Sequence, residues 1–393
     1  MRRFEYRDDK SAKFWSVAVS GATMTVSYGR IGSDGQTKRK DFDDEAKANA
    51  EAEKLIGQKV KKGYVETDGG AAAAAAQTAI ETPSKTKTKA TPKTKTKTKT
   101  KSRLAPLQLT AQVEPRQLHY GLVLGLGVSG KRVAAVGGQG SDLFYLSATG
   151  GKYSKKKSPG PGLRSAYLDG DTLWVCGEYG YVAKSPDRGK TWTRIDTGAR
   201  ACLFGIVADD AGHIWTAGDA GFLAVSHDGE TFRKVGGVAQ YIARISNSPL
   251  GILVPTDKPG YLYIVNDKSV ERCKGLKAGQ DLMYACVTEA GSLVVVGLSG
   301  QIYRSTDRGK TFETIKCPVK GHLTGIDILA DGRLVAVGDR GAVLVSDDDG
   351  ASFKKLKHGL TSDMLWCCKA HGDGMVIGGA QGTIFYLAAA EKA

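Results

Sequence analysis

The first side chains of this 393-residue chain that could do specific chemistry are Tyr28 and Arg30, which flank Gly29 at the end of a strand-like run. A glycine-rich turn follows, and the helix-like stretch after it ends in lysines. A tyrosine ring can stack on a sugar or a base, while arginine and lysine can contact phosphates. The chemistry that this pattern offers is nucleic-acid recognition. The predicted contact residues are Tyr28, Gly29, Arg30, Lys38, Arg39, Lys61 and Lys62.

A small sheet and one helix are needed to position these residues. Strand-like runs at 14–19 and 24–28 are separated by a tight turn, and a third run covers 36–42. The helix that follows has acidic residues at its start, lysines in its last turn and Gly63 just past its end. Residues 1–66 are therefore predicted to form an α+β domain.

Residues 1–66 resemble the WGR domain, named for its Trp-Gly-Arg signature, with Tyr28 in the place of the tryptophan. The resemblance implies that the aromatic residue and the arginine contact DNA, with ends and nicks as the candidate sites. A second interpretation is that the module docks a protein, with Arg30 in a salt bridge and Tyr28 packed on the sheet. The net charge of this segment is only +3, which does not by itself require a polyanionic partner.

Residues 67–103 change composition abruptly to alanine and then to alternating lysine and threonine. This segment has a net charge of +7, nearly half of the +15 of the whole chain, and nothing in it can form a core. We expect a disordered basic linker. If its lysines contacted phosphates, binding would weaken steeply with salt; the other interpretation is a solubilising spacer.

From residue 104 to 393 the chain repeats itself. A short apolar strand ends in glycine at Gly137, Gly177, Gly218, Gly297, Gly338 and Gly378, at intervals of 40, 41, 79, 41 and 40 residues. The long interval contains a degenerate copy near Pro255. Four short strands per repeat of this length predict a mainly β fold, a seven-bladed β-propeller. The last copy ends early, so we expect residues 107–113 to supply its outer strand and close the ring.

Four loops of similar form follow strands in these repeats. In each loop an Asp and a Ser or Thr should hold a hairpin turn, and an aromatic residue should pack between strands. They resemble Asp boxes, also called BNR repeats. The proposed structural residues are Ser185, Asp187, Gly189 and Trp192; Ser226, Asp228 and Phe232; Ser305, Asp307, Gly309 and Phe312; and Ser346, Asp348, Gly350 and Phe353. The repeats look like the propeller of Ycf48-type photosystem II assembly factors and, more distantly, of sialidases.

Aromatic and basic residues recur near the start of the innermost strands and could surround a ligand-binding channel mouth. The alternative is packing between blades. The candidates are His119, Tyr120, Arg164, Phe204, Tyr241, Arg244, Tyr284, His322 and Trp366. Carboxylates for an acid–base pair could come from Glu178, Asp219, Asp327 or Asp363, but the sequence singles out no pair, and the Arg-Ile-Pro element of sialidases is missing.

The remaining composition indicates which compartment, cofactors and membrane contacts to expect. The seven cysteines include no Cys-x-x-Cys pair, the six histidines show no metal-ligand spacing, and no apolar run is long enough to span a membrane. We expect a cytoplasmic monomer without cofactor, metal or membrane contact.

The leading functional hypothesis is a non-enzymatic adaptor whose N-terminal module and linker bind nucleic acid, expected to be DNA, while the propeller recruits an unidentified protein. The alternatives are a protein-assembly factor that does not bind DNA and a carbohydrate-active enzyme.

Overall fold

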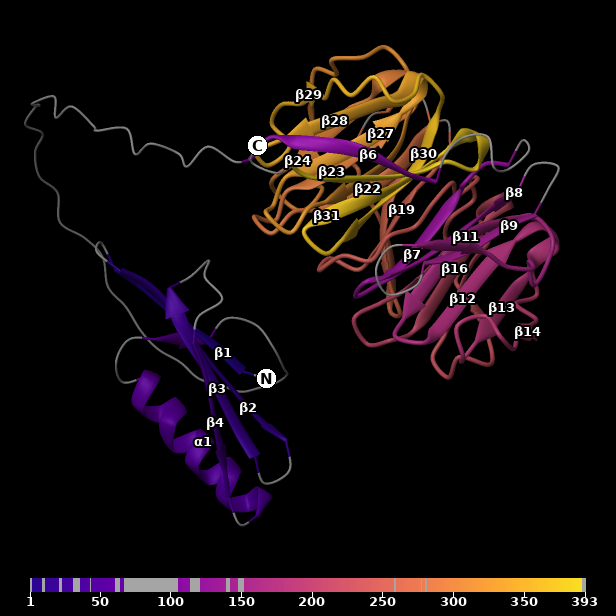
Figure 1. Cartoon of the computed structure of the whole chain (residues 1–393). Coiled ribbons are helices and arrows are strands. Elements are labelled where there is room, and N and C mark those ends of the chain that lie inside the picture. Colours follow the sequence, from indigo (N-terminus) through magenta and orange to yellow (C-terminus); the bar gives the residue numbers. More distant parts are fainter. Residues whose placement is uncertain are drawn as a thin grey trace, which may run out of the picture. The chain divides into compact units, whose positions relative to one another are not determined.

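The computed structural model describes residues 2–8, 11–20, 23–30, 36–42, 44–60, 64–66, 105–113, 121–138, 142–147, 152–257, 259–276, 278–279 and 281–390. The chain divides into two compact units, Met1–Thr98 and Lys99–Ala393 (Figure 1). The predicted linker, residues 67–103, lies outside the described residues, so its boundaries and its disorder stay predictions. Within the described ranges, no helix has both the length and the apolar composition needed to cross a membrane.

The N-terminal unit is an antiparallel sheet with one helix packed against it, as predicted (Figure 1). The strand order is β4-β3-β2-β1-β5. The elements are β1 (Arg2–Asp8), β2 (Ser11–Ser20), β3 (Thr23–Arg30), β4 (Gln36–Asp41), α1 (Glu45–Val60) and β5 (Val65–Glu66).

Alternation along the strands builds the core of this unit. Trp15 lies opposite Tyr28 across the β2–β3 pair, and these side chains belong to one apolar cluster with Ala52 and Ile56 of α1. Burying each large apolar side chain stabilises the fold by about 1.5–3 kcal/mol. The helix begins where Asp44 accepts a hydrogen bond from the backbone N–H of Lys47 at 2.7 Å, an N-cap that satisfies an otherwise unpaired donor.

The C-terminal unit is a β-propeller of short antiparallel sheets (Figure 1). Six sheets of four strands are present among the residues that the structure describes. Their strands are β7 (Gly125–Ser129), β8 (Arg132–Gly138), β9 (Asp142–Ser147) and β10 (Tyr153–Lys155); β11 (Leu163–Asp169), β12 (Thr172–Gly177), β13 (Val182–Ser185) and β14 (Thr193–Ile195); β15 (Leu203–Ala208), β16 (Ile214–Gly218), β17 (Leu223–Ser226) and β18 (Arg233–Lys234); β22 (Leu282–Val287), β23 (Leu293–Gly297), β24 (Ile302–Ser305) and β25 (Glu313–Thr314); β26 (Leu323–Ile328), β27 (Leu334–Gly338), β28 (Ala342–Ser346) and β29 (Lys354–Lys355); and β30 (Leu365–His371), β31 (Gly374–Gly379), β32 (Ile384–Ala389) and β6 (Leu107–Val113).

The predicted count of seven blades is not confirmed, because the degenerate copy forms only a three-stranded sheet. This sheet contains β19 (Ile252–Pro255), β20 (Leu262–Asn266) and β21 (Ser269–Arg272). Two isolated bridges, Ile242 to Thr256 and Ser246 to Leu253, place the segment before β19 beside it without forming a continuous ladder.

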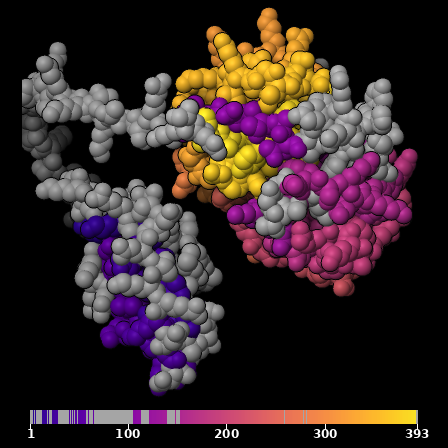
Figure 2. All heavy atoms as spheres, in the orientation of Figure 1, coloured from indigo at the N-terminus to yellow at the C-terminus, as the bar shows by residue number. Residues whose placement is uncertain are grey.

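The predicted ring closure is confirmed. Strand β6 pairs antiparallel with β32 and completes the last four-stranded sheet. Leu109 of β6 is buried in the same cluster as Phe385 and Leu387 of β32. Figure 2 shows β6, in purple, lying across the C-terminal blade, in yellow. Closure gives the outer edge of this blade a partner.

Two glycines of each regular repeat have separate steric causes. A Cβ on Gly338 would lie 1.9 Å from the carbonyl oxygen of His322, because the innermost strand of the blade approaches the second strand closely there. The next turn, Asp339–Gly341, holds Arg340 at a φ of 53° and Gly341 at 61°. Left-handed backbone of this kind favours glycine, which explains the second glycine of the repeat.

The Asp boxes form hydrogen-bonded turns after the third strands of their blades. Ser305 Oγ donates to Asp307 Oδ1 at 2.8 Å and accepts the backbone N–H of Gly309 at 2.9 Å. Asp307 also accepts the side chain and backbone N–H of Thr311 at 2.6 and 2.9 Å. Equivalent bonds surround Asp187, Asp228 and Asp348. The box aromatics, Trp192, Phe232, Phe312 and Phe353, pack into the apolar clusters of the propeller.

Candidate nucleic-acid interface and propeller channel

Tyr28 lies at the edge of the N-terminal core, where its half-buried ring packs with the sheet and helix cluster. An open hollow of about 510 Å³ lies beside it. The hollow is lined by Trp15, Met24, Val26, Tyr28, Lys40, Leu55 and Lys59. Its floor is therefore apolar and aromatic, and two of its lining residues are lysines.

Both lysines of the hollow lie over aromatic rings. Lys59 Nζ is 5.5 Å from the ring centroid of Trp15 and 4.9 Å from that of Tyr64, and Lys40 Nζ is 4.8 Å from that of Phe42. Attraction between a cation and a ring favours these placements. The arrangement brings positive charge and an aromatic surface together, which are the two features that single-stranded nucleic acid and strand ends require of a protein.

The structure describes only part of the predicted contact set. Gly29 and Arg30 end β3, and in the β3–β4 register Lys38 lies opposite Val26 and Arg39 opposite Thr25. The side chains of Arg30, Lys38 and Arg39, and all of Lys61 and Lys62, are outside what the structure describes, so their contact role stays a prediction. The predicted contact set included neither Lys40 nor Lys59, although Lys59 belongs to the basic end of the predicted helix. The sequence does not show which residues will surround a lysine in a basic run.

The mouth of the propeller channel is lined by residues that have no partner in the β-ladder. Each of five innermost strands contains one such residue, at the point where the register shifts: Arg164, Phe204, Met283, Thr324 and Trp366. A β-bulge leaves the extra residue unpaired and re-aims its side chain. All five residues line one cavity of about 250 Å³, together with Tyr241 and Arg244 from the segment before β19. The Phe204 and Tyr241 rings pack with their centroids 4.9 Å apart.

A second cavity of about 450 Å³ is lined by the later residues of the innermost strands, including Tyr284 and Lys369. Arg244 and Thr324 line both cavities and so lie where the two adjoin. The Arg244 guanidinium donates hydrogen bonds to the carbonyl oxygens of Leu124 and Arg164. It thereby joins the segment before β19 to two of the four-stranded blades.

Lys369 adds a fixed positive charge to the second cavity. Its Nζ lies 3.4 Å from Asp327 Oδ2, and attraction to this carboxylate raises the pKa of Lys369. Burial raises the pKa of Tyr284, which lines the same cavity. At neutral pH this part of the channel therefore offers an ammonium group beside an un-ionised phenol.

Six of the nine predicted channel residues line these cavities: Arg164, Phe204, Tyr241, Arg244, Tyr284 and Trp366. His322 lines neither; its ring Nδ1 accepts the backbone N–H of Ser299 at 3.0 Å. His119 and Tyr120 lie outside the described residues. Met283 and Thr324 were missed, because strict alternation along a strand does not reveal a bulge.

The carboxylates that the sequence offered for acid–base chemistry have structural partners. Glu178 pairs with Arg164 at 2.5 Å, and Asp219 accepts the backbone N–H of Cys202 at 3.1 Å. Asp327 accepts the backbone N–H of Ala370 at 2.9 Å besides pairing with Lys369. The amide of Gln381 donates to Asp363 at 3.3 Å. Each group is thus held by a contact that fixes the local backbone or neutralises a neighbour.

Two segments of the chain match separate family models. Residues 1–71 match the WGR domain model. Residues 302–315 match the model of the BNR-Asp box repeat. The WGR domain is similar to segments of two Escherichia coli proteins, the uncharacterized protein YfeS (48% identity over 65 residues, 16% of this chain and 27% of that protein) and protein YehF (48% over 66 residues, 17% and 24%). The chain thus covers only about a quarter of the length of these relatives.

The propeller fold is shared with solved structures of low sequence identity. One is YCF48 bound to D1 peptide, with a TM-score of 0.60, 16% identity and coverage of 72% of this chain and 97% of that chain. Another is a catalytically inactive virginiamycin B lyase from Staphylococcus aureus with quinupristin, with a TM-score of 0.61, 14% identity and coverage of 72% and 99%. YCF48 from Cyanidioschyzon merolae gives 0.58, 14%, 72% and 98%. These likenesses establish the fold alone.

Proposed function

We propose that this chain is a non-enzymatic adaptor that binds nucleic acid, expected to be DNA, through its WGR domain and the basic segment 67–103. The propeller channel would hold a peptide segment of a partner protein. The observation that carries the proposal is the hollow beside Tyr28, because an aromatic floor with Lys40 and Lys59 suits a base or sugar flanked by phosphates.

The predicted residues around the hollow complete this interface. Tyr28 would stack on the nucleic acid and Arg30 would bridge a phosphate, while Lys38, Arg39, Lys61 and Lys62 would neutralise adjacent phosphates. The lysines of segment 67–103 would extend the contact along the strand and increase its salt dependence.

The channel mouth favours a peptide as the ligand of the propeller. Phe204, Tyr241 and Trp366 offer aromatic surface, and Arg244 offers positive charge where the two cavities adjoin. These groups would select an extended segment with apolar and acidic side chains. YCF48, which shares this fold, has been solved with a bound peptide.

We also propose that the three-stranded sheet is an incomplete seventh blade. The bridges of Ile242 and Ser246 support this, because the segment 242–246 lies beside β19 as an innermost strand would, and Arg244 from it lines the channel like the bulged residues of the blades.

The test is fluorescence anisotropy of the full chain on blunt, nicked and single-stranded DNA across a salt series. On duplex DNA, Lys40→Ala and Arg30→Ala should each weaken binding. For each lost phosphate contact, the magnitude of the log–log salt slope should fall by about 0.9. Lys54→Ala is the matched control, because Lys54 is an exposed lysine of α1 that pairs with Glu51 and does not line the hollow.

Equal affinity of wild type, Lys40→Ala and Arg30→Ala for every DNA would contradict the interface. Binding that survives these substitutions but is lost when residues 67–103 are neutralised would assign the DNA contact to the basic segment alone. No binding by the wild type would favour the assembly factor that acts on protein only.

A further inference from the structure

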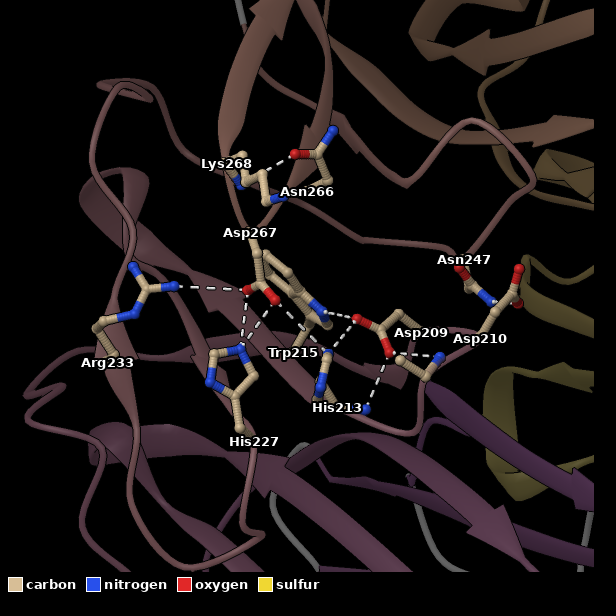
Figure 3. Close-up of polar contacts among 11 residues, drawn as sticks. Asp209, Asp210, His213, Trp215, His227, Arg233, Asn247, Asn266, Asp267 and Lys268 are labelled. Carbon is tan, nitrogen blue, oxygen red and sulfur yellow. Dashed lines mark hydrogen bonds and ion pairs between the residues drawn. The ribbon is translucent and has the colours of Figure 1, made fainter. Parts of the chain in front are cut away.

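Two histidines and an aspartate from three loops converge at one edge of the propeller (Figure 3). His213 lies between β15 and β16, and His227 follows β17 in the same blade. Asp267 lies in the turn between β20 and β21 of the three-stranded sheet. The cluster therefore joins a regular blade to the incomplete one.

The spacing of the three side chains suits one small metal ion. One ligand atom from each of them lies within 4.8 Å of the others. His227 Nε2 is 2.9 Å from Asp267 Oδ1, and His213 Nδ1 is 3.7 Å from Asp267 Oδ2. Ligands about 2.0–2.2 Å from a tetrahedral zinc ion are roughly 3.3–3.5 Å apart, so only small side-chain movements separate this arrangement from a coordination shell.

A second layer of hydrogen bonds holds the histidine side of the cluster. Asp209 Oδ2 lies 3.0 Å from His213 Nδ1 and also accepts the indole N–H of Trp215 at 3.0 Å. Trp215 is only 1% exposed and belongs to the core, so it anchors Asp209. Because the same nitrogen of His213 would bind the ion, its contact with Asp209 would give way on metal binding. Asp209 would keep its bonds to the backbone N–H of His213 and to Trp215, and its negative charge beside the site would favour a cation.

The aspartate side is held by its turn. Asn266 Oδ1 accepts the backbone N–H groups of Lys268 and Ser269, both at 3.0 Å, and so fixes the two-residue turn that presents Asp267 (Figure 3). Asp267 is also 3.5 Å from the guanidinium of Arg233. That arginine side chain is 56% exposed and can swing into solvent when a cation takes its place.

We propose that His213 through Nδ1, His227 through Nε2 and Asp267 bind a zinc ion, with water as the fourth ligand. Two imidazoles beside one carboxylate favour zinc over magnesium or calcium. The ion would fasten the incomplete sheet to the preceding blade at the ends of β17 and β20. His227 occupies the second position of its Asp box, where the other boxes carry Pro186, Thr306 and Asp347.

The experiment uses untagged full-length protein that has been stripped with a chelator. Zinc is titrated calorimetrically into wild type, His227→Gln and Asp267→Asn, and thermal unfolding is followed with and without zinc. The wild type should bind one ion per chain and unfold at a higher temperature with zinc, because a ligand that binds only the folded state stabilises it. Both variants should bind at least tenfold more weakly and lose the shift.

Three further measurements separate this site from other zinc binders. Asp209→Asn should weaken binding, because it removes a negative charge from beside the ligand nitrogen of His213. His322→Gln should leave binding unchanged, because His322 lies outside the cluster. Cobalt(II) should give an absorption spectrum without a thiolate charge-transfer band.

The proposal is overturned if the wild type binds no zinc, if His227→Gln and Asp267→Asn bind it as tightly as the wild type, or if the cobalt spectrum reports cysteine ligands. Circular dichroism checks that each variant is folded. Asp267→Asn is the safer of the two, because it lies in an exposed turn and preserves the shape of the side chain.

Discussion

At the scale of single residues, Arg244 connects separate parts of the propeller. Its guanidinium crosses from the segment beside the three-stranded sheet to the carbonyl oxygens of Leu124 and Arg164. Hydrogen bonds from a charged donor are worth about 1.5–3 kcal/mol each when partly buried. Because no ladder attaches its segment continuously to β19, these bonds would partly replace the missing strand pairing.

Arg244→Met keeps most of the side-chain volume and removes every donor. We expect the free energy of unfolding to fall by about 1–3 kcal/mol, measured from urea denaturation of the full chain. Arg200→Met is the control, since the Arg200 side chain is 83% exposed and contacts Asp196 and the carbonyl oxygen of the adjacent Ala199. An unchanged urea midpoint for Arg244→Met would mean that the channel arginine does not contribute to stability.

The residue scale also shows where sequence reasoning succeeds and where it stops. Recurrence of aromatic and basic types found Phe204, Tyr241, Arg244 and Trp366, because each repeat exposes the same position of its first strand to the channel. The bulge that turns these side chains toward the channel depends on local backbone geometry, which the sequence pattern does not show. The pattern therefore predicted Tyr284 at the channel mouth, whereas its neighbour Met283 lines it and Tyr284 lines the second cavity. The histidine–aspartate cluster was missed for another reason: its members come from three loops with no regular spacing.

At the scale of elements, the Asp boxes make the stability of the blades depend on pH. Hydrogen bonds from the side chain and backbone N–H of Thr311 and from Ser305 lower the pKa of Asp307 to about 2. In the unfolded chain this carboxyl titrates near its ordinary value of about 3.9. Its contribution to stability is therefore present above about pH 4 and is lost as the pH falls through 2.

Asp307→Asn cannot titrate, and its stability should not share this dependence. The wild type should unfold at a higher temperature than the variant at pH 6, and this difference should shrink between about pH 4 and 2. Thermal unfolding across a pH series checks it. Asp347→Asn serves as the comparison, because Asp347 is an exposed acid of the neighbouring box. A difference that stays constant down to pH 2 would contradict the role of the ionised carboxylate.

At the scale of the whole propeller, one short strand holds the ring closed. Leu109 of β6 is 5% exposed and packs into the core of the last blade, whereas Gln108 beside it is exposed. Leu109→Ala should lower the free energy of unfolding by about 2–4 kcal/mol, through lost burial and the cavity left behind. Gln108→Ala should change it by less than about 0.5 kcal/mol. Urea denaturation distinguishes these outcomes, and equal midpoints for the two variants would mean that closure by β6 adds no stability.

The architecture at this scale was largely predictable. The 40-residue interval between glycines gave the order of the blades, and the short last copy indicated that residues 107–113 would pair with the C-terminal strand. The number of blades was not predictable, because the copy near Pro255 forms a sheet of three strands, and only two isolated bridges join the segment before β19 to it. Whether a weak repeat forms a full blade is decided by contacts with its neighbours, which a sequence pattern does not contain.

Closure of the ring also sets an order in time. Thr110 and its hydrogen-bond partner Tyr386 are 276 residues apart in the chain. A ribosome that adds roughly 5–20 residues per second needs on the order of 15 to 55 s to make the residues between them. Throughout that interval Leu109 has been synthesised, but its binding site on the last blade has not. The first strand of the propeller to be made is therefore the last to pair, and it must not pair with other sheet edges before translation is nearly finished.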